Sequence, residues 1–163
     1  MGVDLSFLRE GTKFNVRAAA IIMHEGYILC DREEGLDYSY LPGGRIQRGE
    51  TSAQALVREM REELDVSVQA GDPLIICESF YMSGDMPLHE MSFYFLVEKP
   101  AALPFAKNQI CHTHREDGVE FHHSWVEVSE VGMARAKVEP KQLHQLFIEL
   151  PNSTVHVTIN ELD

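Results

Sequence analysis

The chain has 163 residues, 44% of them hydrophobic, and carries a formal net charge of −12 at pH 7. This length and apolar content suit a single domain, which we expect to span residues 1–163. The acidic balance argues against a nucleic-acid polymer or an anionic membrane as partner, because such binding relies on a basic surface.

Cysteine content and hydropathy bear on location. Cys30, Cys77 and Cys111 are odd in number and lack a Cys-x-x-Cys spacing, so we expect no disulfide framework. The N-terminal residues are charged and have no apolar core, and no later apolar run approaches the ~20 residues that cross a bilayer. These features predict a reduced, cytoplasmic protein, and they leave a homodimer open.

The hydrophobic pattern predicts mostly strands, interrupted by two helices. Helices are expected at Ser52–Leu64 and after Pro140, which suits a first helical position. Residues 99–118 read as a long connection. Strands are expected at residues 14–23, 27–31, 38–41, 66–70, 74–81, 89–98, 119–128 and 155–159. Such a mixture suggests a central sheet covered on both faces.

The first helix has a marked start and a buried stripe. Thr51 and Gln54 form a capping box, in which the hydroxyl and the amide satisfy free backbone N–H groups. At about 100° per residue, one face collects the apolar residues Ala53, Leu56, Val57, Met60 and Leu64. We therefore expect this stripe to pack on the sheet.

Three glutamates, Glu59, Glu62 and Glu63, lie on the flank away from that stripe. Like charges three or four residues apart cost about 0.2–0.5 kcal/mol per pair, unless a positive group lies between them. One interpretation is a solvated charged face with an Arg58–Glu62 ion pair. The other is a divalent cation, because magnesium and manganese favour carboxylate and water oxygens.

A longer pattern surrounds this helix. Gly44 is followed after five residues by Glu50, and after seven more by Arg58-Glu59-Met60-Arg61-Glu62-Glu63-Leu64-Asp65-Val66. The segment from Gly44 to Val66 resembles the Nudix box, with Asp65 replacing the usual glycine. Because Asp tolerates a left-handed backbone less well than Gly, the exchange affects the loop and removes no metal ligand.

The resemblance implies an α/β (α+β) fold, namely the Nudix α/β/α sandwich with a central mixed sheet. It implies magnesium or manganese as cofactor, held by the catalytic residues Glu59, Glu62 and Glu63 and by the carbonyl of Gly44. Glu50 and Arg58 correspond to the pair that braces the loop. Candidate phosphate-binding residues are the glycine loop and two arginines: Gly43, Gly44, Arg45 and Arg17.

The general base is less defined by the resemblance, because family members take it from the box or from a later loop. Glu59 is the first choice. Glu116 and Glu120 are alternatives, since they lie at or after the end of the long connection.

Three other features carry competing interpretations. Arg17 interrupts an apolar strand, so its charge needs either an internal acid or a substrate phosphate. Trp125 is read as a core residue. The segment from Cys111 to His123 holds borderline metal ligands that zinc would accept, but without a second cysteine pair or a finger spacing.

Three functions are consistent with the sequence. The favoured one is magnesium-dependent hydrolysis of the pyrophosphate bond of a nucleoside diphosphate linked to another moiety, such as ADP-ribose or a nucleotide sugar. The second is a (d)NTP pyrophosphohydrolase that cleanses the nucleotide pool. The third is a nonhydrolytic Nudix-type regulatory domain that binds a nucleotide. Selectivity lies outside the box, so the sequence does not separate the first two.

Overall fold

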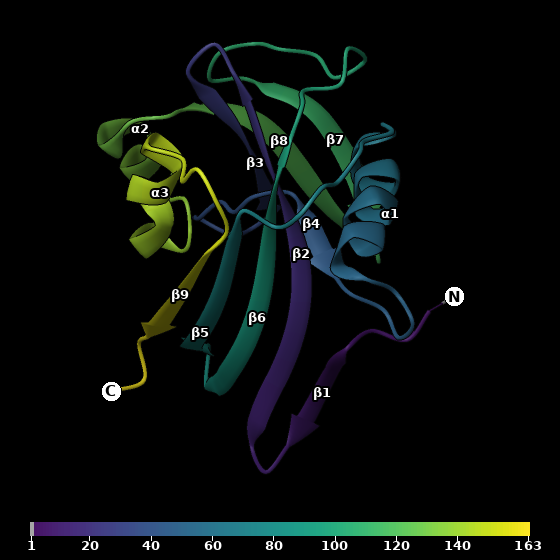
Figure 1. Ribbon diagram of the computed structural model, residues 1–163, viewed down its shortest axis with the longest axis vertical. Coiled ribbons are helices and arrows are strands. Elements are labelled where there is room, and N and C mark those ends of the chain that lie inside the picture. The colour runs from purple at the N-terminus through teal and green to yellow at the C-terminus, as the bar shows by residue number, and fades with distance from the viewer. Residues whose placement is uncertain (1) are drawn as a thin grey trace.

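Figure 1 shows the computed structural model of the protein, which describes residues 2–163. The strands of this part of the chain are β1 (Ser6–Arg9), β2 (Thr12–His24), β3 (Tyr27–Glu33), β4 (Gly43–Arg45), β5 (Ile75–Ser83), β6 (Met86–Val97), β7 (Ile110–Glu116), β8 (Val119–Glu127) and β9 (Val155–Asn160). The helices are α1 (Ser52–Leu64), α2 (Glu130–Arg135) and α3 (His144–Ile148), the last preceded by a 3-10 turn, η1 (Lys141–Leu143).

Within the described residues, the strands form one mixed sheet in the order β7-β8-β3-β2-β6-β5-β9, and β1 and β4 also pair with β2. Strand β2 runs parallel to β6, in a register that extends from Lys13↔Leu88 to Ile22↔Val97. Strand β9 is parallel to β5, whereas β3 is antiparallel to both β2 and β8. The expected central mixed sheet is therefore confirmed.

Helices cover both faces of this sheet, with α1 on one side and α2 and α3 on the other (Figure 1). The alternation of side chains along β2 explains why both faces are apolar. Ala18 and Ala20 point into the core under α1, which also contains Leu56 and Met60 of the helix. Ala19 belongs to the opposite core, whose helix residues include Met133, Leu143 and Phe147. The α/β/α sandwich follows from this pattern.

Helix α1 has the predicted boundaries. The Thr51 hydroxyl accepts a hydrogen bond from the Gln54 N–H at 3.1 Å, and the Thr51 N–H donates to Oε1 of Gln54 at 2.9 Å. The helix ends at Asp65, whose φ of 54° is left-handed. Asp65 therefore adopts the conformation for which the family uses glycine.

Four expectations about secondary structure need correction. Residues 66–70 form no strand, since they run as irregular chain between α1 and β5. Residues 38–41 contribute only isolated bridges, Asp31↔Tyr40 and Ser39↔Val138. Residues 99–118 are not a loop throughout, because Ile110–Glu116 forms β7 and pairs with β8. Pro140 lies before a 3-10 turn rather than at a first helical position, and the helix that follows is short.

Besides β7, three elements, β1, β4 and α2, have no counterpart among the expected segments. Strand β1 exposes Phe7 and Leu8, and its register on β2 includes Phe7↔Phe14. Helix α2 is short and contains a glycine, Gly132, so its sequence lacks a periodic apolar stripe of useful length.

All three cysteines lie among the described residues as free thiols, with Cys30 and Cys77 buried. Across residues 2–163, no helix combines the length and the apolar character needed to cross a lipid bilayer.

Candidate active site

Strand β4 brings the glycine loop directly against α1. It pairs with β2 through Ala18↔Gly44 and Ala19↔Gly43. A Cβ atom on Gly44 would overlap the carboxylate of Glu59, and one on Gly43, where φ is 150°, would overlap the backbone oxygen of Ala18. Only glycine allows the strand to lie this close to the helix acids.

Two of the predicted acids are buried between helix and sheet. Glu59 is 8% exposed and Glu63 is 6% exposed, so the alternative interpretation as a solvated charged face does not hold for these two residues. Burial raises the pKa of Glu59, an effect that the Arg58 hydrogen bond partly offsets. Burial and the charge of Glu59 raise the pKa of Glu63 well above its usual range, although the Gly43 N–H donates to its Oε2 at 3.2 Å.

Arg58 binds several of the box acids at once. It donates to both carboxylate oxygens of Glu50, at 2.6 and 3.0 Å. Its Nη1 also donates to Glu59 at 2.7 Å and to Glu62 at 3.0 Å, and its Nη2 donates to the carbonyl of Arg45 at 2.9 Å. The expected brace with Glu50 is therefore present, but the same arginine also neutralises two predicted metal ligands.

These contacts raise the pKa of Arg58, chiefly through the hydrogen bond to Glu50. The side chain of Glu62 stays 56% exposed. Glu59 and Glu63 thus lie against the glycine strand, and Glu62 is joined to Glu59 through Arg58 and is open to solvent. The three carboxylates do not form a group within 4.8 Å of one another among the described residues. Such a set of hard oxygen donors fits a magnesium or manganese ion that keeps several waters.

The two predicted phosphate-binding arginines sit side by side, since Arg17 and Arg45 are register partners. The guanidinium of Arg17 lies 5.6 Å from the ring centre of Tyr40. Burial works against its charge, but Glu90 and Glu63 are among the groups that raise the pKa of Arg17 above its ordinary value. Arg45 is more exposed and approaches Asp4 at 3.6 Å.

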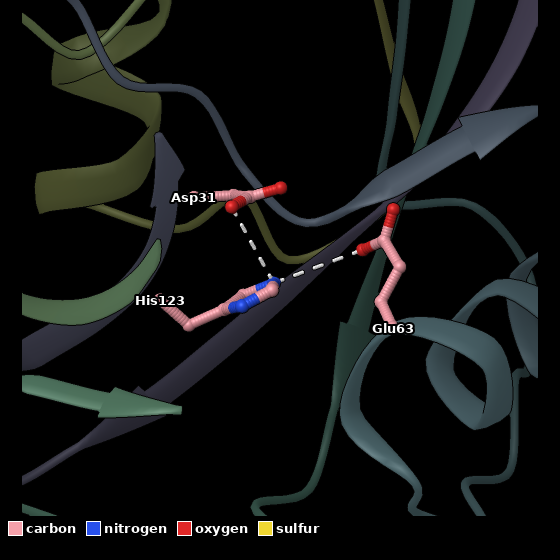
Figure 2. Close-up of side chains that lie close together, drawn as sticks. All are labelled: Asp31, Glu63 and His123. Carbon is pink, nitrogen blue, oxygen red and sulfur yellow. Dashed lines mark ion pairs between the residues drawn. The ribbon is translucent and has the colours of Figure 1, made fainter. Parts of the chain in front are cut away.

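A second cluster lies beside Glu63, as Figure 2 shows. Among the residues that the structure describes, Asp31, Glu63 and His123 form a group whose ligand atoms all lie within 4.8 Å of one another. Nε2 of His123 is 3.6 Å from Oδ1 of Asp31 and 3.8 Å from Oε2 of Glu63. Sequence reasoning missed Asp31, which appeared only as the end of an expected strand.

Burial perturbs both members that come from the sheet. It raises the pKa of Asp31 to about 7 and lowers the pKa of His123 to about 4, so the imidazole is neutral near pH 7. Neither ring nitrogen of His123, nor Oδ1 of Asp31, has a hydrogen-bond partner among the described residues. A buried polar atom left in this state costs about 1–3 kcal/mol.

The alternative base residues differ in their surroundings. Glu120 contacts Nε2 of His122 at 2.6 Å and Arg115 at 3.2 Å, and both contacts hold its pKa below the usual value. Glu116 ends β7, and its charge contributes to the raised pKa of both Glu59 and Glu63. Of the two alternative base residues, Glu116 is therefore the one whose charge acts on Glu59 and Glu63.

The histidine-rich segment does not gather into one zinc site. His112 donates from Nε2 to the carbonyl of Glu63 at 2.8 Å, and Cys111 packs on the apolar core that contains Trp125. His122 pairs with Glu120. Trp125 itself is fully buried, as expected for a core residue.

Comparison with known proteins identifies the class. The NUDIX domain family model matches residues 13–147. Over 96 residues, the chain is 36% identical to the 8-oxo-dGTP diphosphatase of Haemophilus influenzae, a match that covers 55% of this chain and 67% of the relative.

Solved structures share the fold. The MutT protein from Methanosarcina mazei Go1 aligns with a TM-score of 0.59 at 18% identity, covering 86% of this chain and 96% of that one. An ADP-ribose pyrophosphatase from Streptococcus suis aligns with a TM-score of 0.54 at 15% identity, covering 88% and 98%.

The chain belongs to the Nudix family. It is a hydrolase of pyrophosphate bonds, from a family that uses divalent metal ions.

Proposed function

We propose that the protein hydrolyses the pyrophosphate bond of a nucleotide with magnesium or manganese held by Glu59, Glu62 and Glu63 and by the carbonyl of Gly44. The observation that carries this proposal is the burial of Glu59 and Glu63 directly against the glycine strand. Burial raises the pKa of both carboxylates, and the charge of Glu59 raises that of Glu63 further, so this pair is costly without a cation. A bound divalent ion removes that cost.

The bound cation would neutralise the diphosphate and lower the pKa of a water molecule. The backbone and side chains of the protein position the phosphate groups of the substrate. Gly43 and Gly44 leave space for phosphate oxygens near the backbone, and Arg17 and Arg45 add positive charge on the adjacent strands. Arg58 holds Glu59 and Glu62 on a single nitrogen, which keeps both carboxylates near the loop.

We assign the general base to Glu59 or Glu116 rather than to Glu120. The carboxylate of Glu120 is occupied by His122 and Arg115, which makes it a weaker base. Replacing Glu59 or Glu116 with Gln should separate the two, because loss of the base removes the acidic limb of the pH–rate profile, where the rate rises as the base loses its proton, and also lowers turnover. Glu120→Gln serves as the control, with turnover within about threefold of the wild type.

Two substrate classes remain. The sequence favours a nucleoside diphosphate linked to another moiety, of the ADP-ribose or nucleotide-sugar type. The relative from H. influenzae, an 8-oxo-dGTP diphosphatase, favours a (d)NTP of the pool-cleansing type. The nonhydrolytic alternative has no such support, since this chain keeps every box glutamate.

Product identification tests the proposal. The purified protein is incubated with magnesium and ADP-ribose, nucleotide sugars, dinucleoside polyphosphates or (d)NTPs, including 8-oxo-dGTP. Release of pyrophosphate and a nucleoside monophosphate would establish the triphosphate class, and two monophosphates would establish the linked diphosphates. No turnover on any member of the panel, with either metal, would contradict the proposal.

We also infer that the protein acts in the cytoplasm on small nucleotides. Free buried thiols at Cys30 and Cys77 are stable in a reducing compartment. The net charge of −12 disfavours a nucleic-acid polymer as substrate.

A further inference from the structure

Strand pairing places Asp31 and His123 face to face. They are direct register partners on β3 and β8. On each strand the residue two positions away, Leu29 or Trp125, is in the core beneath α1. Since side chains alternate along a strand, Asp31 and His123 also point to the α1 side of the sheet. There the side chain of Glu63 extends toward them from α1 (Figure 2).

The three side chains converge without bonding to one another. The separations of 3.6 and 3.8 Å exceed a normal N–H···O hydrogen bond, and His123 and Asp31 are 0% and 1% exposed. Both ring nitrogens of His123 and Oδ1 of Asp31 have no partner among the described residues. Buried polar atoms in proteins are nearly always satisfied, so this arrangement indicates a missing ligand.

We propose that Asp31, Glu63 and His123 form a binding site for a divalent transition-metal ion of the Zn²⁺ class, next to the all-oxygen magnesium site of the box, with which it shares Glu63. Ligand atoms bound about 2.1 Å from zinc at the tetrahedral angle of about 109° are about 3.4 Å apart. The separations of 3.6 and 3.8 Å from Nε2 of His123 are slightly longer than that spacing, so small side-chain movements would bring all three ligands onto one ion.

The donor set selects the ion. One imidazole nitrogen with two carboxylates suits zinc and its neighbours in the first transition row, whereas magnesium prefers oxygen and water. Three protein ligands would leave a fourth position for water or a phosphate oxygen.

Two neighbouring histidines, His112 and His114, contact this cluster. Nε2 of His112 donates to the carbonyl of Glu63, which anchors the end of α1 where the shared ligand originates. His112 and His114 flank His123 with ring centres 5.7 and 5.2 Å away.

The test measures zinc binding directly and needs no turnover, so it is independent of the proposed hydrolysis. The full chain is stripped with a chelator and titrated with Zn²⁺ by calorimetry, and the zinc-loaded protein is analysed by X-ray absorption at the zinc edge. We expect an imidazole ligand in the wild type. His123→Gln should lose the imidazole signal, and His123→Gln and Asp31→Asn should each weaken Zn²⁺ binding more than about 100-fold, because even outer-shell changes cost about 10–100-fold.

His122→Gln is the matched control, since it removes the adjacent histidine, which pairs with Glu120 instead. It should retain both the affinity and the imidazole signal. Circular dichroism and melting curves of the stripped variants verify that they fold. If folded His123→Gln and Asp31→Asn bind zinc like the wild type, or if the bound zinc shows only oxygen ligands, the proposal is wrong. If the wild type binds no zinc, the proposal is equally wrong.

Discussion

The most informative stability prediction concerns Arg58→Met. This change removes the guanidinium that Glu50, Glu59 and Glu62 share, and it leaves the length and apolar part of the side chain in place. The side chains of Arg58 and Glu50 are each 21% exposed, and that of Glu59 is 11% exposed. The change therefore leaves carboxylates uncompensated in a largely buried setting.

Breaking a buried charge pair by removing one partner costs about 3–5 kcal/mol. Because Arg58 and Glu50 keep some contact with water, we expect the lower end, about 3 kcal/mol of unfolding free energy without metal. For a chain of this length that corresponds to a fall in Tm of about 6–12 °C. The control is Glu62→Gln, which loses only an exposed i,i+4 pair and should cost no more than about 0.5 kcal/mol.

Urea unfolding in the presence of a chelator measures both changes. A loss of less than about 1 kcal/mol for Arg58→Met, or equal losses for the two variants, would refute the view that Arg58 holds the acids together when no cation is bound. Added magnesium should raise the Tm of the wild type by mass action.

Three further predictions follow from local contacts. Gly43→Ala places a Cβ against the backbone oxygen of Ala18 on β2, at a φ of 150°. We expect the free energy of unfolding in urea to fall by at least about 1–3 kcal/mol and turnover to decrease. Unchanged values would refute the close approach of β4 to β2. Hydrogen bonding to Arg58 lowers the pKa of Glu50. The stabilisation that Glu50 contributes is therefore complete above the ordinary carboxyl pKa and is lost as the pH falls through the lowered pKa of the folded protein. The difference in unfolding free energy between wild type and Glu50→Gln should shrink in acid, and a difference independent of pH would contradict this. Phe147→Ala empties a fully buried site and should cost about 3–5 kcal/mol, whereas Ile148→Ala next to it, 38% exposed, should cost clearly less.

The sequence predicted those parts of the fold that depend on local periodicity. Helix α1 was placed correctly because Thr51 and Gln54 cap it and its stripe is regular. The expected C-terminal helix is longer than the observed one, because Leu143 and Phe147 are both buried at helical spacing although Leu143 belongs to the 3-10 turn and only His144–Ile148 is α-helical. Strand β7 gives little sequence signal, since it is largely polar, has no buried residue and depends on its pairing with β8.

The site was only partly predictable, because it depends on contacts between segments that are distant in the sequence. Glu59, Glu62 and Glu63 stand out by helical spacing, but their burial depends on how closely β4 approaches. Asp31 gives almost no signal on its own, because its partner His123 is far along the chain and only the strand register brings them together. Asp31 lies two residues after the core residue Leu29 and therefore on the same apolar face of the strand. An acidic residue at such a position was the sign of a site that the sequence offered.

The dependence of turnover on Glu62 tests the central claim most directly. Glu62 is exposed and contributes little to stability, so the loss of its charge should act on the metal and hardly on the fold. With a substrate found in the panel, Glu62→Gln should fold normally and turn over about two orders of magnitude more slowly than the wild type at saturating magnesium. Undiminished turnover of the folded variant would contradict the assignment of the box carboxylates as the ligands of a catalytic cation.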